Sequence, residues 1–145
     1  MPRPNVRQTS SVIGAGAFLA LLVAAAWGGM SYTAKSEFCI SCHVMKPMYE
    51  TAYHSAHRLG NTCGDCHVPS GIFNKAVYEA TSGIKHMFYF YSGLTPDVIR
   101  ITKSDQKIVN RNCQRCHSAV VAEIKTTADG PQCLDCHRST PHNNI

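Results

Sequence analysis

Every cysteine in the chain belongs to a repeated Cys-x-x-Cys-His motif, and this repeat constrains the fold more than any other feature. In a c-type attachment site the two thiols add across the vinyl groups of haem, and the adjacent His is placed under the iron as an axial ligand. The sequence therefore predicts four covalently attached haem c groups. The attaching cysteines are Cys39, Cys42, Cys63, Cys66, Cys113, Cys116, Cys133 and Cys136.

Other classes of site that use cysteine pairs fit the repeat less well. A zinc ribbon does not need a His after each pair. A thioredoxin-like redox site carries one pair in a βαβ context, which this sequence lacks. Disulfides closed over two residues are strained, so a disulfide framework would not favour this spacing in every copy. Haem is attached covalently outside the cytoplasmic membrane, and the haem-bearing part is therefore predicted to be periplasmic.

An apolar segment near the N-terminus predicts a single membrane-spanning helix. The 19 residues from Val12 to Met30 carry no charge, and as a helix they span about 28 Å, close to the hydrocarbon thickness of a bilayer. Arg3 and Arg7 precede the segment, which leaves the N-terminus cytoplasmic by the positive-inside rule. We expect a cytoplasmic arm over 1–11, an anchor in the inner membrane over 12–32, and a tetrahaem domain over 33–145.

The alternative for the apolar segment is a signal peptide that is cleaved. The run Ala24-Ala25-Ala26 offers small residues at which such cleavage occurs. However, the apolar stretch is longer than the usual hydrophobic region of a signal peptide, which is about 7–15 residues. The first haem cysteine, Cys39, also follows only seven residues after Tyr32. Both observations favour a retained anchor.

The remaining chain is too short to build a separate core around each haem. Residues 33–145 provide fewer than thirty residues for each of the four haems, so we expect the haems to stack and act as the core. The predicted fold is mainly α with much irregular structure, with short helices at the attachment sites and essentially no sheet. The formal charge of +5 falls to roughly zero once the propionates of four ferric haems are counted, so it does not indicate a nucleic-acid partner.

Axial ligands decide which haems carry electrons, and the residues leave their choice open. Four six-coordinate haems need eight ligands, and the chain has eight His: four in the motifs, and His54, His57, His86 and His142. The first motif has a further candidate, since Met45 follows His43 by two residues. The Met45 thioether either packs against the porphyrin or replaces His43 on the iron, which would raise the potential of this haem.

The order of these features resembles the NapC/NirT family of cytochromes c. The anchor is followed by Cys-x-x-Cys-His-x-Met, by His54-Ser-x-His57, by a second motif before Val68-Pro69, and after a long gap by two closing motifs. The resemblance covers nearly the whole chain. It implies a quinol dehydrogenase that oxidises menaquinol and passes electrons to a periplasmic, ammonia-forming multihaem nitrite reductase in a hetero-oligomer. A generic electron hub for several reductases, or a terminal reductase with an open haem, is the alternative.

The resemblance also implies a set of ligands, with the haems numbered in the order of their motifs. Met45 would be the ligand of haem 1, and His142 and His57 the distal ligands of haems 3 and 4. The distal ligand of haem 2 would come from the partner enzyme, and His54 and His86 would be left over. The proximal ligands of haems 2, 3 and 4 would be His67, His117 and His137.

The segment between the second and third motifs, residues 72–93, has two interpretations. Its aromatic side chains either pack on haem faces or build a quinol pocket at the membrane surface, where aromatic rings are favoured. Quinol oxidation needs a group that accepts protons, and the resembled family uses a lysine and an acidic residue in this region. Lys75 and Glu79 are one helical turn apart and are predicted to share a face. Ser82 stands where an acidic side chain is expected.

Overall fold

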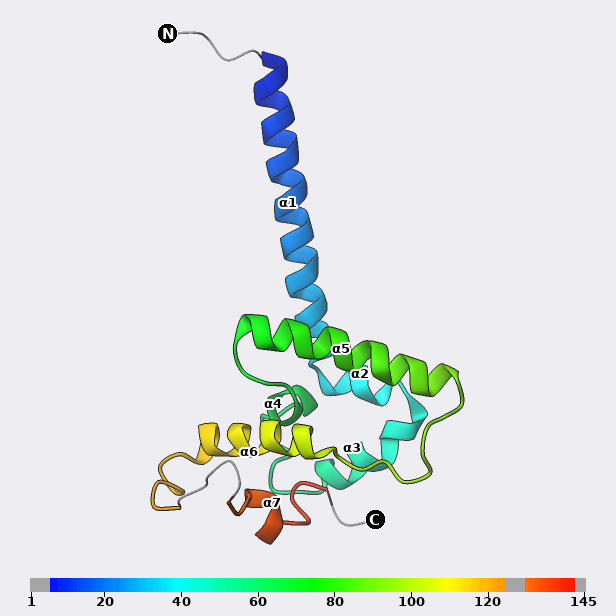
Figure 1. The fold of residues 1–145 in the computed structure, drawn as a ribbon, viewed down its shortest axis with the longest axis vertical. Coiled ribbons are helices and arrows are strands. Elements are labelled where there is room, and N and C mark those ends of the chain that lie inside the picture. The colour runs from blue at the N-terminus through cyan, green and yellow to red at the C-terminus, as the bar shows by residue number, and fades with distance from the viewer. Residues whose placement is uncertain (1–5, 125–129, 143–145) are drawn as a thin grey trace. The chain divides into compact units, whose positions relative to one another are not determined.

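All regular secondary structure in the residues that the computed structural model describes, 6–124 and 130–142, is helical, and turns and irregular segments join the helices (Figure 1). No strand occurs in those two ranges, which confirms the mainly α prediction. Arg3, on which the predicted orientation partly depends, lies outside them. Two compact units are separated after Tyr32. The elements are α1 (Val6–Thr33), α2 (Ser36–Ile40), the 3-10 helix η1 (His43–Met45), α3 (Lys46–Tyr53), α4 (Cys63–His67), α5 (Ile72–Tyr91), α6 (Lys103–His117) and α7 (Cys133–Cys136).

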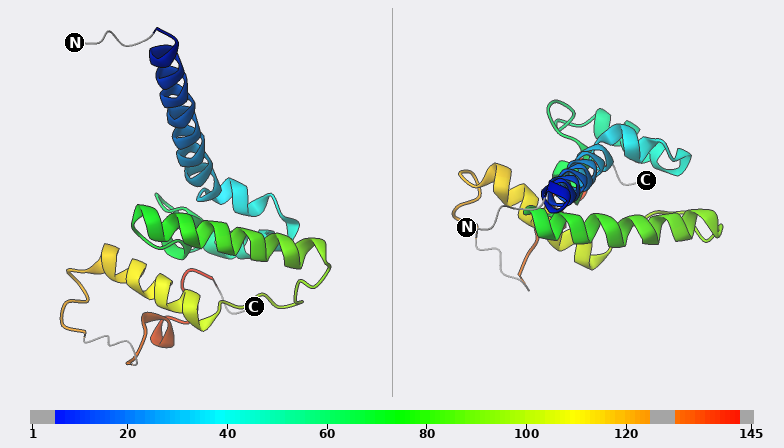
Figure 2. Two further views of the ribbon diagram at one scale, coloured as in Figure 1. Left: turned by 45° about the horizontal axis from the view of Figure 1, so that its top comes forward. Right: turned by 90° about the horizontal axis from the view of Figure 1, so that it is seen from above.

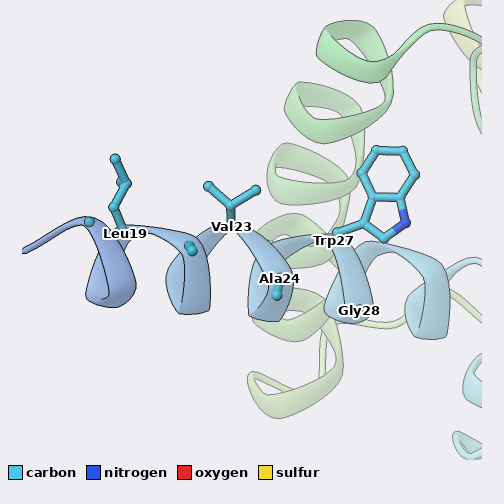
Figure 3. Close-up of a pocket in the computed structure, with 7 residues that line it drawn as sticks. Leu19, Val23, Ala24, Trp27 and Gly28 are labelled. Atoms are coloured by element: carbon cyan, nitrogen blue, oxygen red, sulfur yellow. The ribbon is translucent and has the colours of Figure 1, made fainter. Parts of the chain in front are cut away.

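Helix α1 contains the predicted anchor and is longer than the apolar run. It begins at Val6, so the second half of the predicted cytoplasmic arm is helical. The stretch Thr9–Thr33 is long and apolar enough to cross a membrane, with a mean hydropathy of 2.0. One side of it forms a shallow apolar strip in which Leu19, Val23 and Trp27 stand over small residues (Figure 3). A helix that is apolar on all sides is typical of a membrane span.

The second unit places a helix at each attachment motif. Motif 1 begins in the last turn of α2 and ends at the first residue of η1. Helix α4 coincides with motif 2, the C-terminal end of α6 contains motif 3, and α7 holds the two cysteines of motif 4. The longest element of this unit is α5, a continuous helix of 20 residues. Figures 1 and 2 show α5 along one edge of the unit and α6 with α7 along the other.

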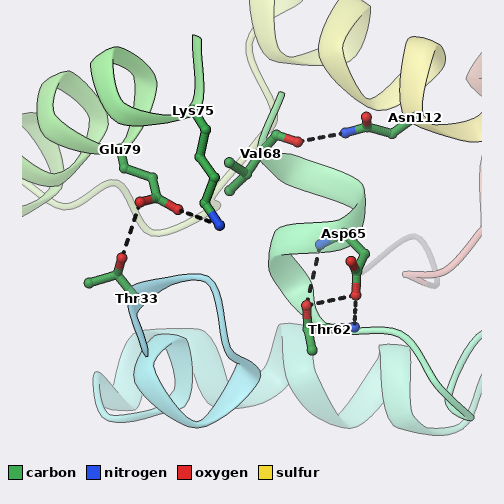
Figure 4. A network of polar contacts seen from close by, with 7 residues as sticks. All are labelled: Thr33, Thr62, Asp65, Val68, Lys75, Glu79 and Asn112. Atoms are coloured by element: carbon green, nitrogen blue, oxygen red, sulfur yellow. Dashed lines mark hydrogen bonds and ion pairs between the residues drawn. The ribbon is translucent and has the colours of Figure 1, made fainter. Parts of the chain in front are cut away.

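The short motif helices begin where side chains satisfy the backbone groups that a helix start leaves unpaired. At α4, Asp65 N donates to Thr62 Oγ1 at 3.3 Å, and Thr62 N donates to Asp65 Oδ2 at 2.7 Å (Figure 4). At α7, Gln132 and Asp135 form the same reciprocal arrangement. In both motifs the residue before the second Cys is an Asp, so the motif itself supplies half of its helix cap.

Two buried asparagines on α6 connect motif 3 to its neighbours. Asn112 Nδ2 donates to Cys66 O and to Val68 O, both at 2.9 Å (Figure 4 shows the second bond). The Cys133 N–H donates to Asn110 Oδ1 at 2.8 Å. Both amides are about 95% buried, where a hydrogen bond is costly to leave unmade. Helix α6 therefore holds motif 2 through Asn112 and motif 4 through Asn110.

Motif 2 is also held by the segment that follows the anchor. Gly64 N donates to Ala34 O at 3.0 Å, and Cys63 N donates to Ser36 Oγ at 3.2 Å. A Cβ atom at Gly64 would lie 2.5 Å from Ala34 O, so this close approach needs a glycine. The backbone contacts thus join the start of the unit to motif 2, motif 2 to motif 3, and motif 3 to motif 4.

The polypeptide itself supplies almost no hydrophobic core. Among the described residues, Val109 is the one buried hydrophobic side chain, and the other two buried residues are Asn110 and Asn112. A domain of this size normally buries a contiguous set of apolar side chains. The packing agrees with the expectation that the bound haems act as the core.

We predict that Gly64→Ala destabilises the haem-loaded protein, because the new methyl group would displace the Ala34 carbonyl and break its hydrogen bond with residue 64. Gly83→Ala is the matched control. It lies within α5, where a Cβ meets nothing within 4 Å, and should raise stability by about 0.5–1 kcal/mol. Thermal unfolding in detergent, followed in the Soret band, measures both. Equal melting temperatures for Gly64→Ala and the parent would contradict the close approach.

We predict that Asn112→Ala lowers the free energy of unfolding by about 1–3 kcal/mol for each of the two carbonyls that lose their donor. The control is Asn61→Ala, whose amide makes only exposed contacts of 3.3 and 3.5 Å. Urea denaturation of the two holoproteins compares them directly. A loss no larger than that of the control would show that α6 does not hold motif 2 through this amide.

Candidate functional site

The eight motif cysteines have the chemistry that haem attachment requires. None of them forms a disulfide, so all eight thiols are available for thioether bonds. Their contacts run between motifs that are neighbours in the chain. Cys39 is hydrogen-bonded to Cys63, and Cys113 to Cys133.

These contacts set the acidity of the thiols. Hydrogen bonding to Cys63, followed by burial, raises the pKa of Cys39, so Cys39 keeps its proton and donates it to Cys63. Accepting that bond lowers the pKa of Cys63 to about 6. Burial raises the pKa of Cys66, and burial with the nearby Cys133 raises that of Cys113 to about 11. The thiolate is the reactive form of a cysteine, and the lowered pKa of Cys63 favours this form.

Four histidines form two facing pairs. The ring centroids of His57 and His117 are 6.0 Å apart, and those of His67 and His142 are 6.1 Å apart. Two imidazoles that bind one metal ion from opposite sides, with bonds of about 2 Å each, have centroids roughly 6 Å apart. Each pair joins a motif His to a His outside the motifs. Both pairs therefore fit the two sides of a haem iron.

The hydrogen bonding around His142 fixes its tautomer and leaves one ring nitrogen free to bind a metal. Thr51 Oγ1 lies 3.2 Å from His142 Nδ1 and donates its own proton to Met48 O at 3.0 Å. Because the hydroxyl has one hydrogen, it must accept from Nδ1–H, which leaves Nε2 with a free lone pair. Burial lowers the pKa of His142, and burial followed by the nearby His142 lowers that of His67. Both rings are thus neutral, as metal ligation requires.

His57 is placed by a turn that follows α3. Ser55 Oγ donates to Ala52 O at 2.7 Å and accepts from His57 N at 3.2 Å. The Nδ1 atom of His57 is buried and has no hydrogen-bond partner. Buried polar atoms are rarely left unpaired, and this one lies on a ring that faces His117. The ring chemistry fits a side chain that binds a haem group.

The ring contacts differ from the distal pairing that the resemblance implied. His142 faces His67 of motif 2 rather than His117 of motif 3. His57 faces His117 of motif 3 rather than His137 of motif 4. The sequence indicates which histidines are candidate ligands. Which rings lie next to each other depends on the path of the chain, because each pair joins residues that are far apart in the sequence.

The remaining candidate ligands lie apart from these pairs. His43 is exposed and its ring meets that of Phe90 on α5 at 5.9 Å, whereas Met45 is half-buried at the end of η1. His54 is exposed beside Tyr53, and His86 is exposed on α5. The exposed ring of His137 contacts none of the other imidazoles, all of which lie in the described ranges.

The predicted quinol residues share one face of α5. Lys75 Nζ lies 3.8 Å from Glu79 Oε1, and the two side chains are 31% and 12% exposed. Glu79 Oε2 accepts a hydrogen bond of 3.3 Å from Thr33 Oγ1 (Figure 4). Oε1 is buried and has no hydrogen bond. Ser82 lies one turn further on the same face and is half-buried. The structure therefore brings an ammonium group and a carboxylate together, and the Ser82 hydroxyl lies one turn further on, hydrogen-bonded to Tyr78.

Several residues that position these groups were not predicted. Thr33 at the end of α1 bonds the Glu79 carboxylate, and Thr51 fixes the tautomer of His142. Asn110 and Asn112 lie just before motif 3. The sequence around them is rich in charged residues, so nothing in it indicates that these two side chains are buried. A helical plot of residues 103–117 would have placed Asn112 on the same side as Val109.

The chain is similar in sequence to known cytochromes c. Residues 3–145 match the NapC/NirT cytochrome c family, N-terminal region. The chain is 31% identical over 131 residues to the cytochrome c nitrite reductase subunit NrfH of Nitratidesulfovibrio vulgaris, covering 90% of this chain and 82% of that protein. It is 32% identical over 120 residues to the cytochrome c-type protein NrfH of Wolinella succinogenes, covering 74% and 68%.

A solved structure is similar over the same length. It is the crystal structure of the cytochrome c nitrite reductase NrfHA complex bound to the HQNO inhibitor, with a TM-score of 0.79 and 31% sequence identity, covering 91% of this chain and 90% of that one. Residues 3–145, which match the family model, include all four motifs. The chain belongs to the NapC/NirT cytochrome c family.

Proposed function

We propose that this chain oxidises menaquinol at the membrane and passes the electrons to a periplasmic multihaem nitrite reductase. The carrying observation is the carboxylate of Glu79, which is 12% exposed, beside Lys75, and hydrogen-bonded to the residue at which the apolar helix ends. A quinol lies in the bilayer and must give up protons when it is oxidised. This carboxylate is a proton acceptor at the point where the chain leaves the membrane.

The chain's own residues account for the protons of the reaction. Oxidation of one quinol to quinone releases two electrons and two protons. Bound haem c supplies one-electron redox chemistry, so two electrons leave the quinol singly. Glu79 Oε1, which has no hydrogen bond of its own, accepts one hydroxyl proton. The Lys75 ammonium and the Ser82 hydroxyl orient the other polar groups of the quinol, and the second proton passes to solvent.

The ligand set follows from the ring pairs and the first motif. We assign His67 with His142 to haem 2, and His117 with His57 to haem 3. Met45 is assigned to haem 1, since His43 is turned to Phe90. His137 would hold haem 4. The resulting set is Met45, His57, His67, His117, His137 and His142, with His54 and His86 not used.

We infer that the partner enzyme contacts the part of the unit around motif 4. The relative NrfH from N. vulgaris is named a nitrite reductase subunit, and the similar solved structure is named a complex. Because His142 faces His67, haem 2 would obtain its second ligand within this chain. A ligand supplied by the partner enzyme therefore belongs to haem 4, whose His137 is exposed. The haem-bearing unit lies on the periplasmic side, where covalent attachment takes place.

We predict that the detergent-solubilised holoprotein is reduced rapidly by a menaquinol analogue and that a quinol-site inhibitor abolishes the reduction. Stopped-flow absorption of the haem bands gives the rate. Removing a general base typically costs a factor of about 10²–10⁴, so Glu79→Gln should slow the reduction at least tenfold. Lys75→Met should also slow it.

The control is Lys85→Met, which removes an exposed ammonium from another side of the same helix and should leave the rate unchanged. All variants should be reduced by dithionite to the same extent. Equal rates for Glu79→Gln and Lys85→Met would rule out the carboxylate as the acceptor. Absence of reduction in the parent, with dithionite still effective, would leave a membrane-tethered carrier fed by another protein. Copurification of a single reductase would argue against a general electron hub.

We predict that His57→Ala and His142→Ala each convert one haem from low spin to high spin, because each removes a strong-field ligand from an iron with two His. His54→Ala is the matched control, since its exposed ring faces Tyr53, and it should leave the spectrum unchanged. Electron paramagnetic resonance of the oxidised protein measures the spin states, and intact mass confirms four attached haems. An unchanged His142→Ala spectrum would refute the assignment to haem 2.

A further inference from the structure

Helix α5 carries an exposed apolar stripe along its whole length. The positions of its side chains follow the 3.6-residue period of the helix, so they fall on one face. Their exposed fractions run from 47% at Val77 to 79% at Phe73. We call these residues the outer stripe: Phe73, Val77, Ile84, Met87, Phe88 and Tyr91.

The other face of α5 is polar and is turned toward the unit. Lys75, Glu79 and Ser82 are half-buried there, together with Tyr78, whose hydroxyl donates to Asp105 Oδ1 at 3.1 Å. A helix on the surface of a soluble protein has the opposite arrangement, with the apolar face on the core. The bonds of Tyr78 to α6 and of Glu79 to Thr33 fix which face points outward. The apolar face of α5 therefore points away from the protein, and its polar face packs against the protein.

Thr33 identifies what covers the outer stripe. It is the last residue of the apolar stretch Thr9–Thr33, and its hydroxyl bonds Glu79, near the middle of α5. The midpoint of α5 therefore lies within one hydrogen bond of the place where the chain leaves the bilayer. The stripe extends over 19 residues, or about 28 Å of helix. It can be immersed along its full length only if α5 lies in the plane of the membrane surface.

We propose that α5 is a second membrane element, an interfacial helix whose outer stripe is immersed in the boundary between lipid headgroups and acyl chains. Its Phe and Tyr content is typical of that depth, and a helix with one apolar and one polar face binds there without crossing the bilayer. The occupant of the stripe is phospholipid. The argument depends on the membrane anchor and on the contacts of α5, and it holds whether or not the chain oxidises quinol.

Photocrosslinking in native membranes tests the proposal with the full, haem-loaded chain and its coexpressed reductase. A benzophenone amino acid, p-benzoylphenylalanine, replaces Ile84 or Phe73 in the stripe. The control replaces His86, which is also exposed but lies on the polar side of the same helix, and a second control replaces His54 after α3. Intact mass spectrometry after illumination identifies a phospholipid adduct by its added mass, and the haem spectrum of each variant confirms folding.

We expect lipid adducts at residues 84 and 73 in at least about tenfold greater yield than at residues 86 and 54, since only the stripe reaches acyl chains. Adducts of residue 84 with the reductase or with a second copy of this chain would overturn the proposal and make the stripe a protein interface. Equal lipid labelling at all four positions, or none at residue 84, would also overturn it. Quinol turnover is not part of the readout, so failure here is distinct from failure of the proposed function.

Discussion

The arrangement of the second unit depends on the side-chain amides of α6. Asn112 and Asn110 each reach from the turn before motif 3 to the backbone of another motif, with bonds of 2.8–2.9 Å. A domain with a hydrophobic core can position its elements by apolar packing, but here Val109 is the one buried apolar side chain in the described ranges. Directional bonds to backbone atoms replace that packing. They keep three attachment motifs in register so that large cofactors can complete the core.

Polarity is distributed around α5 in a way that follows from its two neighbours. One face meets the protein through Tyr78 and Glu79, and the opposite face carries exposed apolar side chains. The carboxylate of Glu79 consequently lies on the side of α5 opposite its exposed apolar side chains, close to the end of the apolar span. Such an arrangement puts a titratable group near the bilayer without exposing its charge to hydrocarbon, which would be costly.

Much of the architecture could be predicted because its signals are local. The cysteine motifs, the uncharged segment and the lysine and glutamate one turn apart depend on residues within a few positions of one another, and the structure shows each as expected. The ring contacts of His57 and His142 could not be predicted, since a separation of 75 positions between His67 and His142 leaves the chain path undetermined. The spacing of the outer stripe is visible in the sequence, but its aromatic residues are equally compatible with packing on haem faces, so the spacing alone does not indicate a lipid-facing side.

The position of His142 in the sequence has a consequence for assembly. Motif 2 emerges early when an anchored chain is transferred across a membrane from its N-terminal end, and its Cys63 and Cys66 can receive a haem at once. The imidazole that faces His67, however, follows motif 4 in the chain. If His142 binds haem 2 as proposed, this haem lacks its second ligand until all four motifs have been translocated. Because the site at motif 2 would be completed by residue 142, the second unit could finish folding only after the whole haem-bearing segment had crossed the membrane.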